Sequence, residues 1–274
     1  MKNYTICVIA LFILPYFAGR LSAATVDTLT LQSKSLGKET KVVVILPDSY
    51  NARLTLKFPV VYLLHGYTGN FSDWVKNVPS IKEYADRYQC IIVCPDGENS
   101  WYIDSKVMDN SNYSSYSGAE LPLYINKTYR TYKDRNQTAI TGLSMGGHGA
   151  LYLAMNHEET FGAAGSMSGA LDISSFGNHY NIGKIVGDTT LAAVGQYACL
   201  QLVSGKDINQ KIVLDCGIED IFIHQNRAMH NRLMELSIPH DYTERPGGHT
   251  WDYWKNAIEY QLLFFRRFFD EKNG

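Results

Sequence analysis

The sequence predicts an α/β fold with a mostly parallel sheet covered by helices on both faces. Short apolar runs alternate along the chain with longer stretches of helical periodicity. Two runs, PVVYLLH at 59–65 and CIIVC at 90–94, are almost wholly apolar, as is typical of strands buried on both faces. No repeat, low-complexity tract or linker follows Ala24, so we expect one domain over 25–274.

The same patterns place the other elements in chain order. Further strands are expected at 26–31, 41–46, 138–141, 162–167 and 211–215, and from His240 onward. Helical spacing covers 145–156, 221–236 and 251–270. Residues 169–209 are irregular, and we expect them to form an insertion near the top of the sheet.

The composition excludes some classes of protein. Of the 274 residues, 45% are hydrophobic and 12% aromatic, which argues against a disordered or fibrous chain. The net charge is −2, and without residues 1–24, which hold Lys2 and Arg20 and no acid, 23 basic side chains face 27 acidic ones, a net of −4. An acidic balance of this kind argues against a nucleic-acid partner.

The first 24 residues have the pattern of a secretory signal peptide. Lys2 precedes a 13-residue, mostly apolar run, 6–18, and the small residues 22–24 follow. The run is interrupted by Pro15 and is shorter than the ~20 residues that cross a bilayer. We therefore expect cleavage after Ala24, a secreted or periplasmic protein, and no membrane span in the mature chain.

The cysteines do not form a metal-binding pattern. Four remain after the signal, namely Cys90, Cys94, Cys199 and Cys216. Cys90 and Cys94 sit at the two ends of one expected strand, about 13 Å apart, which is too far for a disulfide. None stands in a CxxC or Cys/His spacing, so we expect buried apolar side chains, no metal and no cofactor.

The segment GLSMGG at 142–147 fits the G-x-S-x-G motif, with Ser144 at its centre. An expected strand precedes it and an expected helix follows, which is the context that the motif requires. The glycines leave room for neighbouring backbone at a strained turn, and the helix N-terminus favours developing negative charge. The segment predicts a nucleophilic serine.

A serine hydroxyl needs a base, and the base needs a carboxylate to orient it. His249 follows Pro246-Gly247-Gly248 and precedes an aromatic-rich helix that starts at Trp251, so we expect it on a loop from which it can reach the serine. His148, inside the helix after Ser144, is better interpreted as a packing residue.

The acid is expected after the strand 211–215, before the next helix. Asp215 lies within the apolar run and is better suited to contacting backbone or a neighbouring loop. Glu219 and Asp220 both lie on the turn, and their spacing alone does not distinguish them.

Two backbone N–H groups are expected to bind the oxyanion. One belongs to Met145, the residue after the nucleophile. The other is expected from the glycine-containing loop that follows the strand at 59–65, and Tyr67 is the candidate.

Five segments in this order, LLHGYTGNFSDW, CPDGENSWY, ITGLSMGGHGAL, DCGIEDIFIHQNR and GGHTWDYW, resemble the esterase D type of α/β-hydrolase. That group includes carbohydrate esterase family 1 (feruloyl and acetylxylan esterases), tributyrin esterases, S-formylglutathione hydrolases and mycolyltransferases. The resemblance spans roughly residues 40–265. It implies the α/β-hydrolase fold and serine esterase activity through an acyl-enzyme, assigns the acid to Asp220, and supports Tyr67 as oxyanion donor.

Aromatic side chains cluster around the expected site and suit a hydroxycinnamoyl or sugar group. They are Tyr67, Trp74, Trp101, Tyr102, Trp251 and Tyr253, of which Trp101 and Trp251 are the predicted substrate-binding residues. With export, they favour feruloyl esters of plant polysaccharides, or else acetylated carbohydrate, as substrate.

Several alternatives stay open. An acetylxylan or short-chain esterase and an acyltransferase of the mycolyltransferase type share the same motifs. An S-formylglutathione hydrolase carries a cysteine in the loop after HG, where this chain has YTGNFSDW. Outside enzymology, the alternative is a carbohydrate-binding protein on an inactive hydrolase fold.

Overall fold

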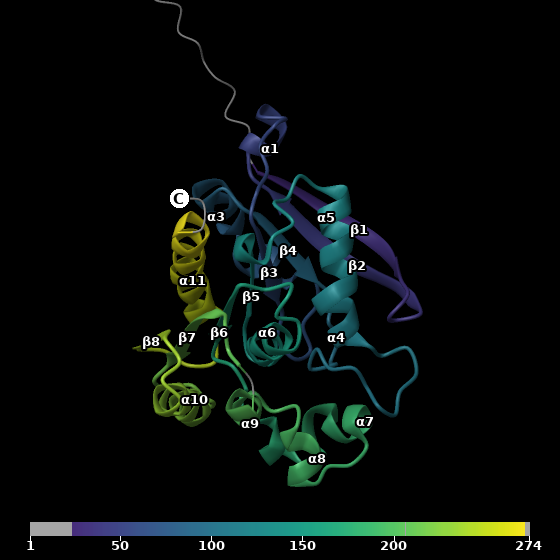
Figure 1. Ribbon diagram of the computed structural model, residues 1–274, viewed down its shortest axis with the longest axis vertical. Coiled ribbons are helices and arrows are strands. Elements are labelled where there is room, and N and C mark those ends of the chain that lie inside the picture. The colour runs from purple at the N-terminus through teal and green to yellow at the C-terminus, as the bar shows by residue number, and fades with distance from the viewer. Residues whose placement is uncertain (1–23, 206, 272–274) are drawn as a thin grey trace, which may run out of the picture.

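One eight-stranded sheet forms the centre of the computed structural model, which describes residues 24–205 and 207–271 (Figure 1). The strand order is β1-β2-β4-β3-β5-β6-β7-β8, antiparallel across β1, β2 and β4 and parallel elsewhere. This is the predicted fold class. The expected signal peptide, apart from Ala24, lies outside the described residues and stays a prediction.

The strands lie where the apolar runs predicted them. They are β1 (Thr25–Ser33), β2 (Lys38–Leu46), β3 (Val60–Leu64), β4 (Ile91–Pro95), β5 (Thr138–Gly142), β6 (Ala163–Met167), β7 (Lys211–Gly217) and β8 (His240–Arg245). The strands β3 to β6 are buried at every position, because helices cover both of their faces.

The three predicted helices lie close to their expected bounds, as α6, α10 and α11, and several shorter helices that the periodicity did not predict accompany them. The α-helices are α1 (Ser49–Ala52), α2 (Asp73–Asn77), α3 (Ile81–Tyr88), α4 (Tyr113–Ser115), α5 (Leu121–Thr128), α6 (Met145–Asn156), α7 (Ile182–Val186), α8 (Leu191–Gly195), α9 (Cys199–Leu202), α10 (Ile223–Glu235) and α11 (Trp251–Glu271). A π-helical turn, η1 (Tyr116–Glu120), and the 3₁₀ turns η2 (Arg135–Gln137), η3 (Ile173–Phe176), η4 (His179–Asn181) and η5 (Val203–Gly205) complete the set among the described residues.

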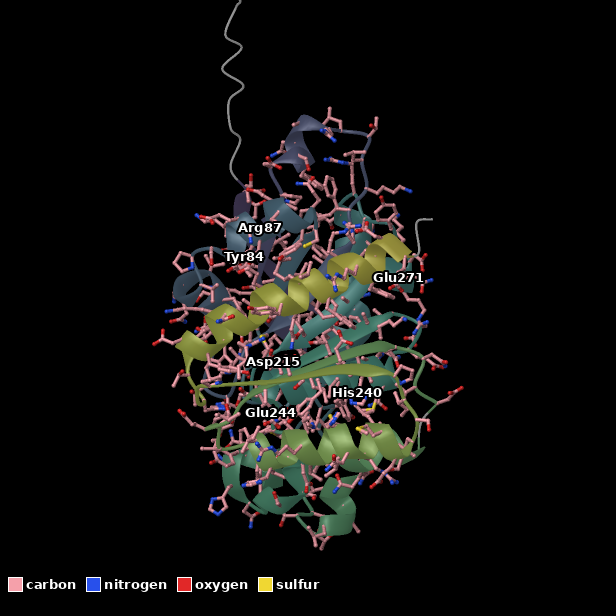
Figure 2. The ribbon with its side chains drawn as sticks, turned by 90° about the vertical axis from the view of Figure 1, so that its left-hand side faces the viewer. Tyr84, Arg87, Asp215, His240, Glu244 and Glu271 are labelled. Carbon is pink, nitrogen blue, oxygen red and sulfur yellow. The ribbon has the colours of Figure 1, made fainter. Side chains whose placement is uncertain are left out.

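Two apolar clusters lie on opposite faces of the sheet, because alternate residues of a strand point to opposite sides. Tyr62 of β3 belongs to the cluster that α5, α6 and α10 cover, whereas its neighbour Leu63 belongs to the cluster under α3 and α11. In Figure 2, α11 crosses the sheet on this second face. The carboxyl ends of the parallel strands are therefore left to the loops, where the candidate site forms.

The expected insertion runs from the end of β6 to the start of β7 and contains α7, α8 and α9, drawn in green at the lower end of Figure 1. Its first part returns to the loop after β3, since the ring of Tyr180 lies 5.6 Å from that of Tyr67. The insertion thus borders the carboxyl edge of the sheet.

The four cysteines of the described chain are buried, as predicted, and all four are free. Burial raises the pKa of the Cys90 thiol to about 12. Among the described residues, no helix has the length and apolar character to cross a membrane.

Candidate active site

Ser144 lies on a sharp turn between β5 and α6, with φ 55° and ψ −117°. A Cβ atom on Gly142 would lie 2.6 Å from the backbone of Gly146, and one on Gly146 would lie 2.5 Å from the carbonyl oxygen of His65. Both glycines are needed for backbone contacts, as predicted. The turn places the hydroxyl at the carboxyl end of β5, where the α6 N-terminus begins.

His249 joins the serine to a carboxylate. Its Nε2 lies 3.0 Å from Ser144 Oγ, and its Nδ1 lies 3.0 and 2.9 Å from the two carboxylate oxygens of Asp220. The Asp220 side chain is fully buried, while that of His249 is 20% exposed. An ionised carboxylate only accepts hydrogen bonds, so Nδ1 carries the proton and Nε2 accepts the bond from the Ser144 hydroxyl.

Among the described residues, neither of the two competing acids is hydrogen-bonded to His249. Asp215 is buried and accepts hydrogen bonds from Tyr253 and Arg245. Burial raises the pKa of the Asp215 carboxyl, and these two donors oppose the rise. Glu219 is exposed, and its backbone N–H donates to Gly247 at 3.0 Å. Of the three acids, the structure brings Asp220 to His249.

The two expected oxyanion donors flank Ser144. Met145 is the first residue of α6, and Tyr67 lines the same cavity as the serine. Within the described part of the chain, neither backbone N–H donates to another residue. Both amides therefore remain available to an oxygen that binds beside the serine.

The loop that carries Tyr67 is held by His65, a residue that the sequence did not single out. Its ring is buried, and Nδ1 lies 2.8 Å from the carbonyl oxygen of Gly66. A carbonyl only accepts, so Nδ1 donates, and Nε2 accepts from the Gly97 N–H at 2.8 Å. The neutral ring links the loops after β3 and β4 and fixes the backbone next to Tyr67.

A cavity of about 270 Å³ opens beside Ser144 and His249. Its walls are Gly66, Tyr67, Thr68, Gly69, Asp73, Leu143, Trp251 and Trp254. Trp251 lies here, where it was predicted to lie, and Trp254 is an addition that helical spacing could have suggested, three residues further along α11.

Trp101 was predicted to bind substrate, but it does not line the cavity. Its side chain is 2% exposed and lies outside the lining of the cavity. The indole N–H donates to the carbonyl oxygen of Tyr180 at 2.8 Å, and the ring lies 6.2 Å from that of Tyr67. The residue supports the wall of the site from behind, because its ring packs against those of Tyr67, His148 and Phe176.

His148 packs as expected. It is fully buried and stacks on Tyr152, and burial lowers the pKa of its ring to about 4. Among the described residues, no group of three or more His, Cys, Asp or Glu side chains is arranged to hold a metal ion.

The family model described as "Putative esterase" matches residues 33–265. The chain belongs to this esterase family. An acetyl esterase from Caldicellulosiruptor saccharolyticus is 30% identical over 262 residues, covering 82% of this chain and 92% of the relative.

Solved structures of similar esterases share the fold. A ferulic acid esterase with 29% identity matches with a TM-score of 0.79 over 90% of this chain and 99% of its own. A carbohydrate esterase family 1 ferulic acid esterase from Anaeromyces mucronatus, solved with ferulic acid, matches with a TM-score of 0.68 at 21% identity, over 89% of this chain and 91% of that one. This esterase is thus an α/β-hydrolase that resembles family 1, as the motifs predicted.

Proposed function

We propose that this esterase is an exported serine hydrolase that cleaves carboxylic esters of plant polysaccharides through an acyl-enzyme, with hydroxycinnamoyl groups as preferred acyl groups. The observation that carries the proposal is the continuous hydrogen-bonded chain from Ser144 Oγ through His249 to Asp220. This chain ends at a cavity with two tryptophans in its wall.

The geometry supports a two-step reaction. His249 Nε2 takes the proton of Ser144 as Oγ attacks the ester carbonyl, and the amides of Tyr67 and Met145 bind the oxyanion. The imidazolium then donates its proton to the leaving alcohol. Water, deprotonated by the same nitrogen, attacks the acyl-enzyme and releases the acid. Asp220 orients the imidazole and stabilises its charged form throughout.

The substrate preference rests on the aromatic wall of the cavity. The ring centroid of Trp251 lies 5.2 Å from that of Trp74 and 5.4 Å from that of Trp254, both in edge-to-face contacts. Packing therefore fixes the position of this ring. A flat aromatic acyl group can pack on this wall. The similarity to a ferulic acid esterase at 29% identity favours the same substrate class.

An acetyl group is the second candidate, and a specific observation favours it. The acetyl esterase relative is 30% identical over most of both chains. An acetyl group would fill little of a cavity of about 270 Å³, so the two candidates differ in how much the tryptophan wall contributes.

A comparison of methyl ferulate, acetylated xylan and tributyrin as substrates tests the proposal. Aromatic pairing adds about 0.5–1.5 kcal/mol, which corresponds to a preference of roughly 2- to 13-fold in kcat/KM for the hydroxycinnamoyl ester over an aliphatic ester of the same alcohol. Trp251→Ala is expected to lower this ratio more than it lowers activity on an acetyl ester. Good activity on acetyl esters with none on methyl ferulate would refute the feruloyl preference and leave the esterase activity intact.

Export is tested separately. Expression with the full N-terminus in a secreting host, followed by N-terminal sequencing of the exported protein, is expected to give Thr25 as the first residue. An exported protein that still begins at Met1, or retention in the cell, would contradict the signal-peptide assignment.

A further inference from the structure

Four aromatic rings form a continuous row that ends at the catalytic histidine. The ring centroid of Tyr67 lies 5.6 Å from that of Tyr180, Tyr180 lies 5.1 Å from Phe176, and Phe176 lies 6.0 Å from Phe222. The Phe222 ring meets the His249 ring edge to face, with 5.2 Å between their centroids. We call Tyr67, Phe176, Tyr180 and Phe222 the aromatic row. Two of its members, Phe176 and Tyr180, are distant in sequence from the motifs that define the site.

The aromatic row is accessible to a ligand. Tyr180 is 49% exposed, and Tyr67, Phe176 and Phe222 are half-buried. A contiguous set of partly exposed rings next to a nucleophile is a common feature of ligand sites, because such surface is costly to leave in water. The hydroxyls of the two tyrosines add hydrogen-bonding groups at the edges of flat apolar faces.

The row is held in place at some cost to the backbone. Tyr180 and Asn181 both have left-handed backbone, with φ of 54° and 65°. Trp101 lies behind the row, donates its indole N–H to the Tyr180 carbonyl oxygen and contacts Phe176 at 5.6 Å. Strained backbone supported by a buried tryptophan is typical of positions that a function requires.

The row begins in the cavity wall at Tyr67 and continues outside the cavity. The His249 ring contacts Trp254 of the cavity wall, at 4.9 Å between ring centroids, and Phe222 of the row, at 5.2 Å. Phe176, Tyr180 and Phe222 do not line the cavity, which at about 270 Å³ is below the usual range of roughly 300–1,000 Å³ for whole small-molecule ligands. An ester extends in two directions from its carbonyl, so the cavity holds one half and the other half must lie outside it.

We propose that the aromatic row is the subsite for the alcohol half of the ester, and that it binds the sugar rings of a carbohydrate. Pyranose and furanose rings present apolar C–H faces and hydroxyl edges, which match rings that carry hydroxyl groups. The proposal rests on the proposed esterase function but does not depend on which acyl group is cleaved.

The test compares esters that share an acyl group and differ in the alcohol. The pairs are a feruloylated xylo-oligosaccharide with methyl ferulate, and an acetylated xylo-oligosaccharide with methyl acetate. Tyr180→Ala is expected to lower kcat/KM for the oligosaccharide esters by about 2- to 13-fold while leaving the methyl esters within about 2-fold. Tyr180→Phe, which keeps the ring, is expected to retain most of the oligosaccharide activity.

Tyr132→Ala is the matched control, because Tyr132 is also partly exposed, at 40%. It follows Thr131, which forms a bridge with Phe58 just before the start of β3. Tyr67 follows the other end of β3, so Tyr132 lies away from the aromatic row. It should change neither class of ester. Equal losses on oligosaccharide and methyl esters in Tyr180→Ala, or no loss on either, would overturn the proposal. Because both acyl groups are assayed, a wild-type enzyme that prefers acetyl groups would refute the feruloyl preference alone and leave this test valid.

Discussion

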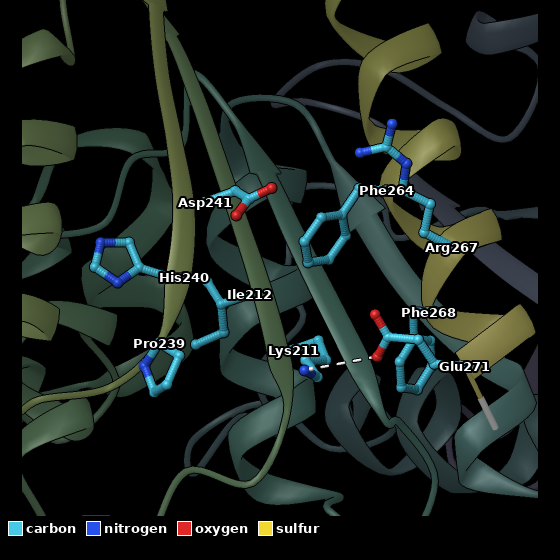
Figure 3. A pocket seen from close by; sticks show the side chains of 9 residues that line it. All are labelled: Lys211, Ile212, Pro239, His240, Asp241, Phe264, Arg267, Phe268 and Glu271. Atoms are coloured by element: carbon cyan, nitrogen blue, oxygen red, sulfur yellow. Dashed lines mark ion pairs between the residues drawn. The ribbon is translucent and has the colours of Figure 1, made fainter.

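Two cavities of nearly the same size lie at opposite ends of the sheet. The one beside Ser144 is at the carboxyl ends of the strands and measures about 270 Å³. The other measures about 260 Å³ and lies between the start of β7 and β8 and the last turns of α11, where Figure 3 shows its lining side chains. In Figure 2, the labels of His240 and Glu271 mark this second region. Asp215, in β7, lies toward the other end of the sheet.

The two cavities differ in how their polar groups are held. Beside the serine, side chains from three loops, those of Ser144, Asp220 and His249, are joined by hydrogen bonds and are buried or half-buried. In the second cavity, Lys211 and Glu271 form an ion pair of 3.7 Å with side chains 53% and 59% exposed. Exposed pairs of this kind contribute little, because water and salt screen them.

Volume is therefore a poor guide to function in this molecule. Chemistry needs groups held in a fixed relation to one another, and within the described chain only the cavity at the carboxyl end has a serine, a histidine and an aspartate joined in this way. The following variants test this difference between the two cavities.

Ser144→Ala is expected to have the largest effect. Removal of the nucleophile should reduce kcat by several orders of magnitude, as much as about 10⁶ in a serine protease, because the triad acts as a unit. Initial rates on p-nitrophenyl acetate, with circular dichroism as a check on folding, measure this effect. A folded variant with more than about a tenth of wild-type turnover would rule out Ser144 as nucleophile.

Asp220→Asn is expected to rank second. An amide at this position favours the wrong tautomer of His249, a change that lowers kcat about 10⁴-fold in serine proteases. Asp215→Asn and Glu219→Gln are the controls, since neither acid contacts the imidazole, and both should retain far more activity. A loss of about 10⁴ in Glu219→Gln, with Asp220→Asn still active, would show that Glu219 and not Asp220 orients His249.

Phe264→Ala and Lys211→Ala, in the second cavity, are expected to have the smallest effect. Both should leave kcat/KM for every ester within about 2-fold of wild type, because nothing in that cavity connects to the reacting atoms. Steady-state kinetics on methyl ferulate and methyl acetate check this. A loss of tenfold or more in a folded variant would mean that the second cavity influences catalysis.

The sequence predicted those parts of the site that depend on local geometry. Ser144 and His249 are marked by glycines and helix starts beside them, and such signals are short-range. Asp220 needed the family resemblance, since the spacing of neighbouring acids does not tell which one faces inward. The inner strands β3 and β4 were predicted well because burial on both faces makes them continuously apolar.

The aromatic residues were harder to predict, because sequence does not tell which rings line a cavity. Among the expected aromatic cluster, Trp101 and Tyr102 are buried in supporting positions, while Tyr67 and Trp251 line the cavity. Phe176 and Tyr180 were missed because they come from an irregular insertion, whose path depends on tertiary contacts such as the bond from Trp101.

The backbone of Ser144 has a consequence for the durability of the enzyme. A non-glycine residue at φ 55° and ψ −117° costs on the order of 1–3 kcal/mol, and the packing around the turn must compensate for it. Ser144→Gly would release this strain, so that this inactive variant should unfold at a higher temperature than the active enzyme. Selection for heat resistance alone would favour loss of the serine, and directed evolution of this esterase must therefore assay activity and stability together.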